Sequence, residues 1–246
     1  MKIFIITICY NRAFDIEKTI KSVVNQTFED IQYIIIDGGS TDGTLDIINK
    51  YIHKIDTIIS EKDHGVYDAM NKGLALAKGE YVLFMNGGDS LYDSNVFAEI
   101  FSTVNKPDLI YGECMLVDKN GIEIMLRSQS INRNLPQTIT ENTFLYGTNI
   151  SHQSFIIRRS LTRPFDDQYK VSADVDWMID AMSKCKSSYL YPKPISKFLR
   201  EGLSSTQQNK GLTERFKVFK SHYGLIKTIY AHFVILARKV GKKVFR

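Results

Sequence analysis

The sequence predicts an α/β fold, with a mixed and mostly parallel sheet covered by helices on both faces, followed by a basic amphipathic helix at the C-terminus. Short β-branched runs alternate with helical periodicities over residues 1–90, which is typical of parallel sheets. Polar residues follow each run directly, as they do where strands end at a ligand-binding edge. Residues 213–246 combine a basic surplus with an apolar stripe, which predicts the terminal helix.

The first two predicted elements are a strand and a helix. Residues 3–9 form a β-branched-rich run that predicts a strand buried on both faces. Apolar residues then recur at helical spacing over 16–27, and Asp15 is placed to cap that helix. We expect a first strand here rather than a signal peptide, because polar residues 10–12 follow without a small-residue cleavage site.

The same alternation continues along the chain. Residues 33–36 predict a second strand that ends at Asp37, and a glycine turn leads to a helix capped by Thr41 or Asp42. The remaining elements of this half are a third strand at 55–59, a helix around 69–77 and a fourth strand at 81–85. The order βαβαβαβ predicts a parallel sheet with helices on both faces.

The carboxyl ends of the four predicted strands carry polar side chains that a parallel sheet brings to one edge. These are Asn11, Arg12, Asp37, the loop 61–67 and Asp89. Neither GxGxxG nor GxxxxGK[ST] occurs in the sequence, which argues against a dinucleotide fingerprint and a P-loop. A nucleotide at this edge would depend on Asp37 for its base or ribose, and on a divalent cation at Asp89 for its diphosphate. Ordinary turn and capping roles are the alternative for Asp37 and Asp42.

Several segments in this order resemble a known family. Residues 37–44 (DGGSTDGT), with 7–12 (TICYNR) before them, resemble the start of the family 2 glycosyltransferases. Residues 60–73 (SEKDHGVYDAMNKG) are similar to a bacterial subgroup that builds capsule, exopolysaccharide and lipopolysaccharide. The resemblance is strong over about the first 90 residues and returns in patches to about Ser205. It implies the GT-A fold, with a Rossmann-like sheet, and a nucleotide-diphosphate sugar as donor.

The resemblance also implies roles at the donor side. Thr7 and Asp37 would contact the nucleobase, commonly uracil, and Asn71 would lie near the ribose or the diphosphate. The other expected donor-binding residues are Asn11, Arg12 and Asn86. The family's metal motif, often Asp-x-Asp-Asp, aligns with residues 86–89 (NGGD), which lack two of the three acidic positions. Asp89 alone would then hold a Mn²⁺ or Mg²⁺ ion, with diphosphate oxygens and water completing the shell.

On the acceptor side, residues 172–178 (SADVDWM) align with the family's Glu-Asp-x-x-Leu segment, whose Asp is the general base in inverting members. Asp174 takes that place, and Asp176 is the rival because an alignment slip of two residues would exchange them. Residues two apart on a helix point to different faces, so only one should reach the acceptor. A solvated carboxylate at a helix start is the competing interpretation of Asp176. The resemblance places acceptor or diphosphate contacts at His152 and Arg200.

The net charge of +5 is unevenly distributed. Residues 213–246 hold nine Lys and Arg against one acidic residue, Glu214, so the rest of the chain holds 23 basic and 26 acidic residues. An apolar stripe over 216–244 with basic residues beside it is typical of a helix on an anionic membrane. Packing of that stripe on the body is the alternative, and breaks at Gly224 and Gly241 would let the two halves differ. Because the basic surplus is confined to this segment, we expect no nucleic-acid partner.

The sequence therefore predicts a GT-A domain at 1–212, with a nucleotide-sugar half (1–100) and an acceptor half (105–205), and a basic helical tail at 213–246. The expected function is inverting transfer from a UDP-sugar to a hydroxyl of a glycan or lipid-linked acceptor in surface-polysaccharide biosynthesis. Three unpaired cysteines and the tail favour a cytoplasmic, peripheral place on the inner face of the membrane. A catalytically inactive nucleotide-sugar-binding scaffold and a sugar nucleotidyltransferase are the alternatives. The sequence leaves the oligomeric state open.

Overall fold

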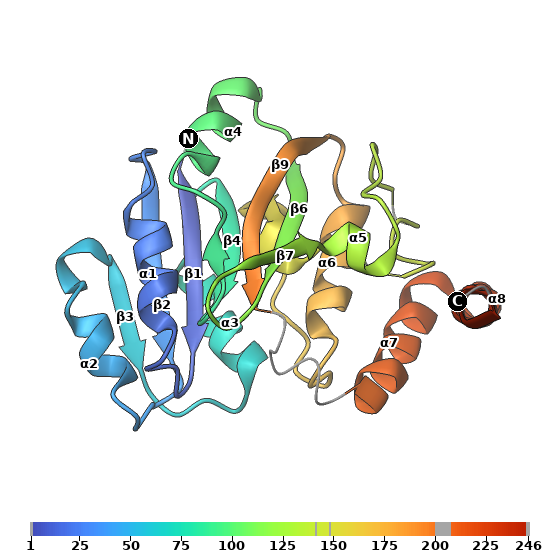
Figure 1. The fold of residues 1–246 in the computed structure, drawn as a ribbon, viewed down its shortest axis with the longest axis horizontal. Coiled ribbons are helices and arrows are strands. Elements are labelled where there is room, and N and C mark those ends of the chain that lie inside the picture. Colours follow the sequence, from blue (N-terminus) through green and yellow to red (C-terminus); the bar gives the residue numbers. More distant parts are fainter. Residues whose placement is uncertain (1, 141, 148, 200–207, 245–246) are drawn as a thin grey trace.

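A nine-stranded sheet forms the centre of the described chain (Figure 1). The computed structural model describes residues 2–140, 142–147, 149–199 and 208–244, with the helix backbone alone at 208–210 and 238–244. The strand order is β3-β2-β1-β4-β8-β6-β9-β5, and β7 pairs with β6. The mixed, mostly parallel α/β architecture expected from the sequence is confirmed.

The first half follows the predicted alternation. Its elements are β1 (Ile3–Cys9), α1 (Ile16–Val24), β2 (Ile31–Asp37), α2 (Thr44–Asn49), η1 (Ile52–Lys54), β3 (Thr57–Ser60), α3 (Val66–Leu76) and β4 (Tyr81–Asn86). Strands β1 to β4 are parallel, and their register pairs Cys9 with Asp37 and Ile8 with Asn86. The polar residues after β1, β2 and β4 therefore meet at one edge of the sheet.

The second half adds antiparallel strands. Its elements are β5 (Ser90–Leu91), α4 (Val96–Thr103), β6 (Leu109–Val117), β7 (Glu123–Leu126), α5 (Arg127–Ile131), η2 (His152–Ser154), β8 (Phe155–Arg158), η3 (Arg159–Leu161), α6 (Ala173–Ser183) and β9 (Ser188–Leu199). Strand β8 lies antiparallel between β4 and β6, and β9 runs parallel to β6. This arrangement brings the end of β4, the turn η2 and the start of α6 close together.

Two apolar layers cover the two faces of the sheet, because successive residues of a buried strand point to opposite sides. Phe4 and Ile6 of β1 belong to the layer that includes α3 and α6. Ile3 and Ile5 belong to the layer that includes α1 and α4. In the first layer Trp177 is buried and stacks on Phe165, with 4.9 Å between ring centroids, so the only tryptophan packs in the core. Both layers give the sheet edge a rigid support.

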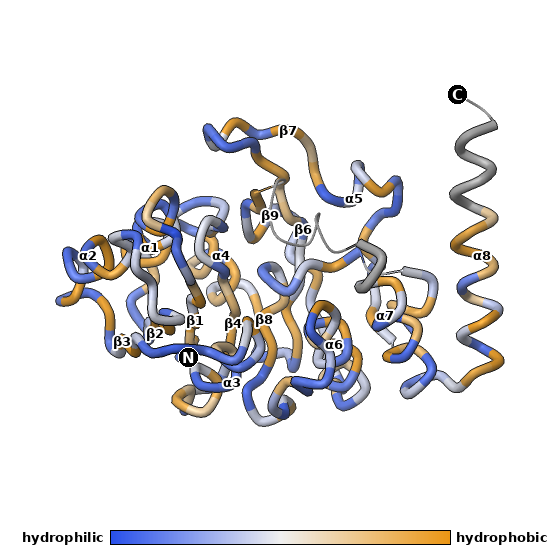
Figure 2. The backbone as a smooth tube through the Cα atoms, turned by 90° about the horizontal axis from the view of Figure 1, so that it is seen from below, coloured by the Kyte–Doolittle hydropathy of each residue, from blue (hydrophilic) through white to orange (hydrophobic). Residues whose placement is uncertain are grey.

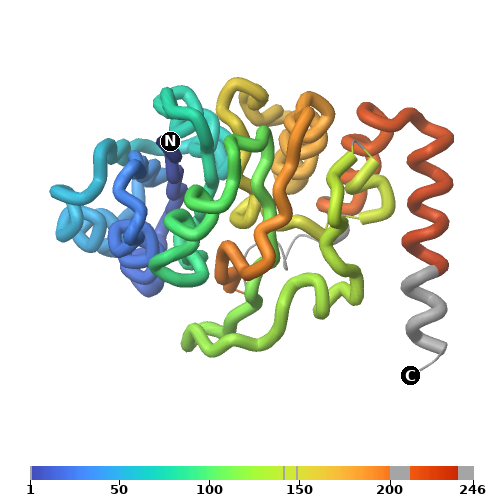
Figure 3. The backbone as a smooth tube through the Cα atoms, turned by 90° about the horizontal axis from the view of Figure 1, so that it is seen from above, coloured from blue at the N-terminus to red at the C-terminus, as the bar shows by residue number. Residues whose placement is uncertain are grey.

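Two helices, rather than one, follow the sheet. Helix α7 (Gln208–Tyr223) packs its Val218 and Phe219 into the core beside α6, and it crosses the predicted boundary at 212/213. Gly224 (φ +80°) separates it from α8 (Leu225–Val244), which stands at the edge of the molecule with α7 between it and the sheet (Figures 2 and 3). The second expected break, at Gly241, is wrong because α8 continues through it. Of the helices that the structure describes, none combines the length and apolar character needed to cross a membrane.

Candidate active site

A hydrogen-bonded chain of four side chains joins α6 to the carboxyl end of β4. Asp174, in the first turn of α6, lies 3.2 Å from His152 Nδ1 through Oδ2 and accepts a bond from the Tyr67 hydroxyl at Oδ1, also at 3.2 Å. His152 Nε2 lies 3.2 Å from the amide nitrogen of Asn86. Three residues predicted for different roles are therefore brought together at one point, and Tyr67 of α3 completes the chain.

The electrostatic environment keeps Asp174 ionised. Burial raises the pKa of Asp174, but the hydrogen bond and charge of His152 and the Val175 N–H more than offset it, so the pKa lies below its usual value. Burial and the charge of Asp174 raise the pKa of Tyr67 well above its usual value, so Tyr67 stays protonated and its hydroxyl donates a hydrogen bond to the carboxylate. An ionised carboxylate that is still partly exposed has the form required of a general base.

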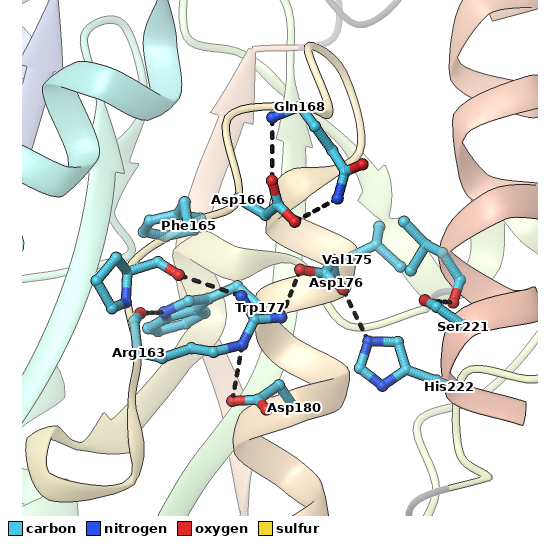
Figure 4. A network of polar contacts seen from close by, with 12 residues as sticks. Arg163, Phe165, Asp166, Gln168, Val175, Asp176, Trp177, Asp180, Ser221 and His222 are labelled. Carbon is cyan, nitrogen blue, oxygen red and sulfur yellow. Dashed lines mark hydrogen bonds and ion pairs between the residues drawn. The ribbon is translucent and has the colours of Figure 1, made fainter.

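Asp176, two residues further along α6, has a different set of partners (Figure 4). Its carboxylate bonds Arg163 Nη2 at 2.6 Å and His222 Nε2 at 2.8 Å, and Arg163 also pairs with Asp180 at 3.3 Å. Burial raises the pKa of Asp176, but His222 and Arg163 more than offset it, so the pKa lies below its usual value. The side chain is 5% exposed and joins α6 to α7. The expected division of Asp174 and Asp176 between two helix faces is what the structure shows.

The ends of β1 and β4 are tied together by Arg12. Its Nε and Nη2 donate to the carbonyl of Gly87 at 2.9 and 2.7 Å, and Nη2 pairs with Asp15 at 3.1 Å. Gly88 has φ +99°, and a Cβ there would lie 2.5 Å from Arg12 Nη2. The glycine turn thus makes room for the guanidinium. Asn11, also at this edge, accepts a bond from the Thr41 N–H at 2.9 Å, which ties β1 to the loop after β2.

Asp37, at the end of β2, and Thr7, two residues before the end of β1, are fully buried. The Asp37 carboxylate accepts bonds from the N–H groups of Gly39 and Ser40 and from two hydroxyls, those of Ser40 and Ser60. Thr7 shares a hydrogen bond of 3.0 Å with the Tyr33 hydroxyl. Both side chains organise the sheet edge in this structure, and their contact with a nucleobase stays a prediction.

Asn71 lies on α3, and both the oxygen and the nitrogen of its side-chain amide bond the backbone of one residue, Phe165. Its oxygen accepts from the Phe165 N–H at 2.7 Å, and its nitrogen donates to the Phe165 carbonyl at 2.9 Å. The residue therefore clamps α3 to the segment before α6, which carries Asp174. Its predicted place near the ribose or diphosphate stays a prediction. Arg200, the other residue expected near the diphosphate, lies outside the described residues.

Asp89 is buried and already bonded through both oxygens. Gln153 donates to Oδ2 at 2.7 Å, and the Leu199 N–H donates to Oδ1 at 3.2 Å. Burial raises the pKa of Asp89 to about 6, although these two bonds lower it. Within the described ranges, no three His, Cys, Asp or Glu residues gather where they could share an ion. The described side chains do not form a cation site by themselves, so no chemical step is derived through a metal ion.

Two further contacts in this neighbourhood have no local sequence signal. Tyr67 resembles any aromatic residue of an amphipathic helix, and Gln153 follows His152 without marking a role. Their partners lie 107 and 64 positions away. Sequence periodicity describes neighbours a few residues apart, so it cannot show such pairs.

Known proteins similar to this chain are glycosyltransferases. Residues 4–163 match the family described as Glycosyl transferase family 2. A "PGL/p-HBAD biosynthesis glycosyltransferase" of Mycobacterium bovis is 30% identical over 212 residues, which cover 82% of this chain and 75% of the relative.

Solved structures share the fold. TarS 1–349 of S. aureus in complex with UDP-GlcNAc matches 90% of this chain and 65% of that one, with a TM-score of 0.68 at 20% identity. The match spans 39% of the longer TarS chain. The mannosyltransferase PcManGT from Pyrobaculum calidifontis, in complex with GDP-Man and Mn²⁺, matches 96% of this chain and 75% of that one, with a TM-score of 0.63 at 17% identity. These likenesses confirm the GT-A-like fold.

The extent of the two sequence matches decides the family of this chain. The match to the family covers more than half of the chain, and the mycobacterial relative extends across most of it. The chain therefore belongs to glycosyl transferase family 2 and is a glycosyltransferase.

Proposed function

We propose that this glycosyltransferase moves one sugar, with inversion, from a UDP-sugar to a hydroxyl of a glycan or lipid-linked acceptor in the biosynthesis of a bacterial surface polysaccharide. The observation that carries the proposal is the chain Tyr67–Asp174–His152–Asn86. It places an ionised carboxylate at the carboxyl end of β4, where an open α/β sheet binds its ligand. A catalytically inactive scaffold would have no need of such a carboxylate.

The proposed chemistry is a single displacement. The acceptor oxygen forms a bond to the anomeric carbon, the bond from that carbon to the β-phosphate oxygen breaks, and Asp174 takes the hydroxyl proton. His152 and Tyr67 hold the two oxygens of Asp174 in place, which fixes the direction of proton transfer. Asn86 couples this unit to the end of β4, beside the expected donor edge.

The choice of donor rests on resemblance and on structural relatives. Residues 37–44 resemble the nucleotide-binding start of family members. The solved structures with this fold hold UDP-GlcNAc in one case and GDP-Man in another. A UDP-sugar is the donor we propose, and GDP-Man is the natural competitor. The surface-polysaccharide role is proposed from the similarity of residues 60–73 to that bacterial subgroup.

The structure supports use of a divalent cation less directly than it supports the donor. The PcManGT structure holds Mn²⁺, but in this chain both oxygens of Asp89 accept hydrogen bonds, from Gln153 and from the Leu199 N–H. Use of Mn²⁺ or Mg²⁺ therefore stays a prediction. A comparison of nucleotide binding in Mn²⁺ and in EDTA decides it.

The test of the donor proposal is a thermal-shift panel of nucleotide sugars on the full chain, followed by donor hydrolysis. We expect UDP and UDP-sugars to raise the melting temperature, because a ligand that binds only the folded state stabilises it. At a ligand concentration of about 100 Kd the gain in unfolding free energy is about 2.7 kcal/mol. A shift with GDP-Man but not with UDP-sugars would overturn the choice of donor, and binding without hydrolysis or transfer would favour the scaffold.

The exposed face of α8 supports a membrane-bound location, which we also propose. Ile226, Tyr230 and Phe233 are 84%, 60% and 69% exposed, and their spacing of three and four places them on one side of the helix. Thr228 and Ala231 are buried toward α7 on the other side. Residues 213–246 carry eight net positive charges, which disfavours pairing with a second copy and favours an anionic lipid surface. The helix then lies on the cytoplasmic face of the membrane, where lipid-linked acceptors are found.

Binding to lipid vesicles tests this location. We expect the full chain to bind phosphatidylglycerol vesicles more tightly than phosphatidylcholine vesicles, and less tightly as salt rises. The double substitution Ile226→Ser and Phe233→Ser should weaken binding at least about tenfold, because each side chain contributes about 1.5–3 kcal/mol when buried. Ile52→Ser with Ile122→Ser removes two other exposed side chains as the matched control. Equal binding by both double variants would contradict the proposed orientation of α8.

A further inference from the structure

Two arginines follow β7 and β9 in the described chain, and one of them, Arg215, lies within range of the charge of Asp174. Arg127 opens α5, and Arg215 lies in the first half of α7. Both are partly buried, and the Nε atom of each is buried without a hydrogen-bond partner. Among the residues that the structure describes, neither guanidinium forms a hydrogen bond or an ion pair. Arginine stays charged at any pH a protein tolerates, so burying it unpaired is costly.

The two side chains share one neighbourhood. Burial lowers the pKa of Arg215, the charge of Asp174 raises it and the charge of Arg127 lowers it further. The two guanidinium groups therefore repel each other, and Asp174 and Tyr67 both lie within range of Arg215. In the ribbon, α5 and α7 both lie beyond α6 from β1 and β4 (Figure 1). A bound anion would relieve the repulsion and satisfy both Nε donors.

The position of the pair favours the acceptor over the donor. The donor edge is formed by the ends of β1, β2 and β4, where Arg12 already donates to Gly87 and pairs with Asp15. Arg127 and Arg215 come instead from segments that follow β7 and β9. Arg127 lies in the half of the chain expected to bind the acceptor (105–205), and Arg215 lies in the helix that follows it. Two planar guanidinium groups suit a phosphate, because its several oxygens can accept hydrogen bonds from both. A carboxylate has only two oxygens, and one guanidinium group in a bidentate pair occupies both of them.

We propose that Arg127 and Arg215 form an anion site that binds a phosphate or phosphodiester group of the acceptor. The anion anchors the acceptor, and the neighbouring hydroxyl then reaches Asp174. The substrate is accordingly a phosphate-bearing glycan or lipid rather than a neutral sugar. The placement of the hydroxyl rests on the proposed function, but the anion site itself does not, so it can be measured without any transfer reaction.

Inorganic phosphate is the probe, titrated calorimetrically into the full chain that has been saturated with UDP. Saturation blocks the donor edge and leaves the arginine pair open. We expect the wild type to bind phosphate, and Arg127→Gln and Arg215→Gln each to weaken it about tenfold or more, since each removes charge-assisted hydrogen bonds. Binding should weaken as salt rises. Arg215→Lys keeps the charge without the fork and should weaken phosphate less than Arg215→Gln does.

Arg159→Gln is the matched control. Its Nε is also buried without a partner, but its guanidinium donates to the Leu74 carbonyl and to Thr162, and η3 lies at the amino end of β4, away from Asp174. Phosphate affinity should be unchanged in this variant, and UDP affinity should be unchanged in all of them. Unaltered phosphate binding by folded Arg127→Gln protein would overturn the proposal, as would UDP and phosphate affinities that fall together, because the pair would then serve the donor diphosphate. Acceptor specificity measured afterwards, with and without a phosphate group, tests the anchoring role separately.

Discussion

Asp174→Asn is expected to lower kcat by about 10³-fold or more while leaving the affinity for UDP within about twofold. The substitution keeps the shape of the side chain but removes the group that takes the proton, and general base catalysis contributes about 10²–10⁴-fold. The new amide would also place a donor against Tyr67 or His152, both of which meet an acceptor oxygen in the wild type. Steady-state transfer kinetics and UDP calorimetry measure the two halves of the result.

Asp176→Asn provides the matched control, two residues further along the same helix. Its carboxylate bonds Arg163 and His222 (Figure 4), whereas Tyr67 and His152 bond Asp174. We expect this variant to lose about 2–3 kcal/mol of unfolding free energy, because two hydrogen bonds between charged groups are weakened. Its kcat should stay within a few-fold of the wild type, measured below its melting temperature.

The opposite pattern would reassign the base. If folded Asp176→Asn protein fails to transfer sugar while Asp174→Asn protein remains active, the alignment with the family segment is two residues out. Loss of UDP binding in Asp174→Asn would instead place this carboxylate in the donor site. The two variants therefore separate the chemical step, the donor site and the stability of α6.

The first four strands show how far sequence patterns reach. Residues 3–9 and 81–85 are runs of almost entirely apolar residues, and a strand buried on both faces has that composition, so both strands were predictable within a residue or two. The polar residues at their ends meet because parallel strands share one edge. Element ends were less predictable. Helix α1 ends at Val24 rather than near residue 27, because Asn25 already leaves the helical conformation.

The site depends on pairings that sequence patterns do not contain. His152 and Asp174 meet because β8 inserts antiparallel between β4 and β6, which places η2 beside the start of α6. Asp89 and Asp37 followed strand ends as expected, but their oxygens bind internal donors whose identity depends on tertiary packing. A strand-end carboxylate has the same sequence signature in both situations, and only the contacts distinguish them.

The tail gives the clearest case of such hidden contacts. Sequence charge separates residues 213–246 from the body, yet Glu214, their one acidic residue, is buried and accepts three backbone N–H bonds. The donors are Lys170 at 3.0 Å, Val171 at 2.7 Å and Ser172 at 3.1 Å, the three residues before α6. A carboxylate there also faces the positive end of the helix dipole. Helix α7 thus holds the end of α6 that carries Asp174.

Glu214→Ala is therefore expected to cost about 3 kcal/mol or more of unfolding free energy, since it leaves three backbone donors without an acceptor. Urea unfolding measures this loss. Below the melting temperature, kcat should fall while UDP affinity is kept, because the loosened start of α6 moves Asp174 and not the donor edge. Glu214→Gln retains one oxygen and should lie between Glu214→Ala and the wild type.

Lys220→Ala, on the exposed face of the same helix, controls for changes in α7 and should stay within about 0.5 kcal/mol of the wild type. If Glu214→Ala loses stability but keeps kcat, the carboxylate holds the fold without positioning the base. If Glu214→Ala keeps both its stability and its kcat, water replaces the three hydrogen bonds without loss of unfolding free energy, and α7 has no part in catalysis. A fall in kcat with intact UDP binding shows that the helix next to the proposed membrane anchor also sets the geometry of the chemical step.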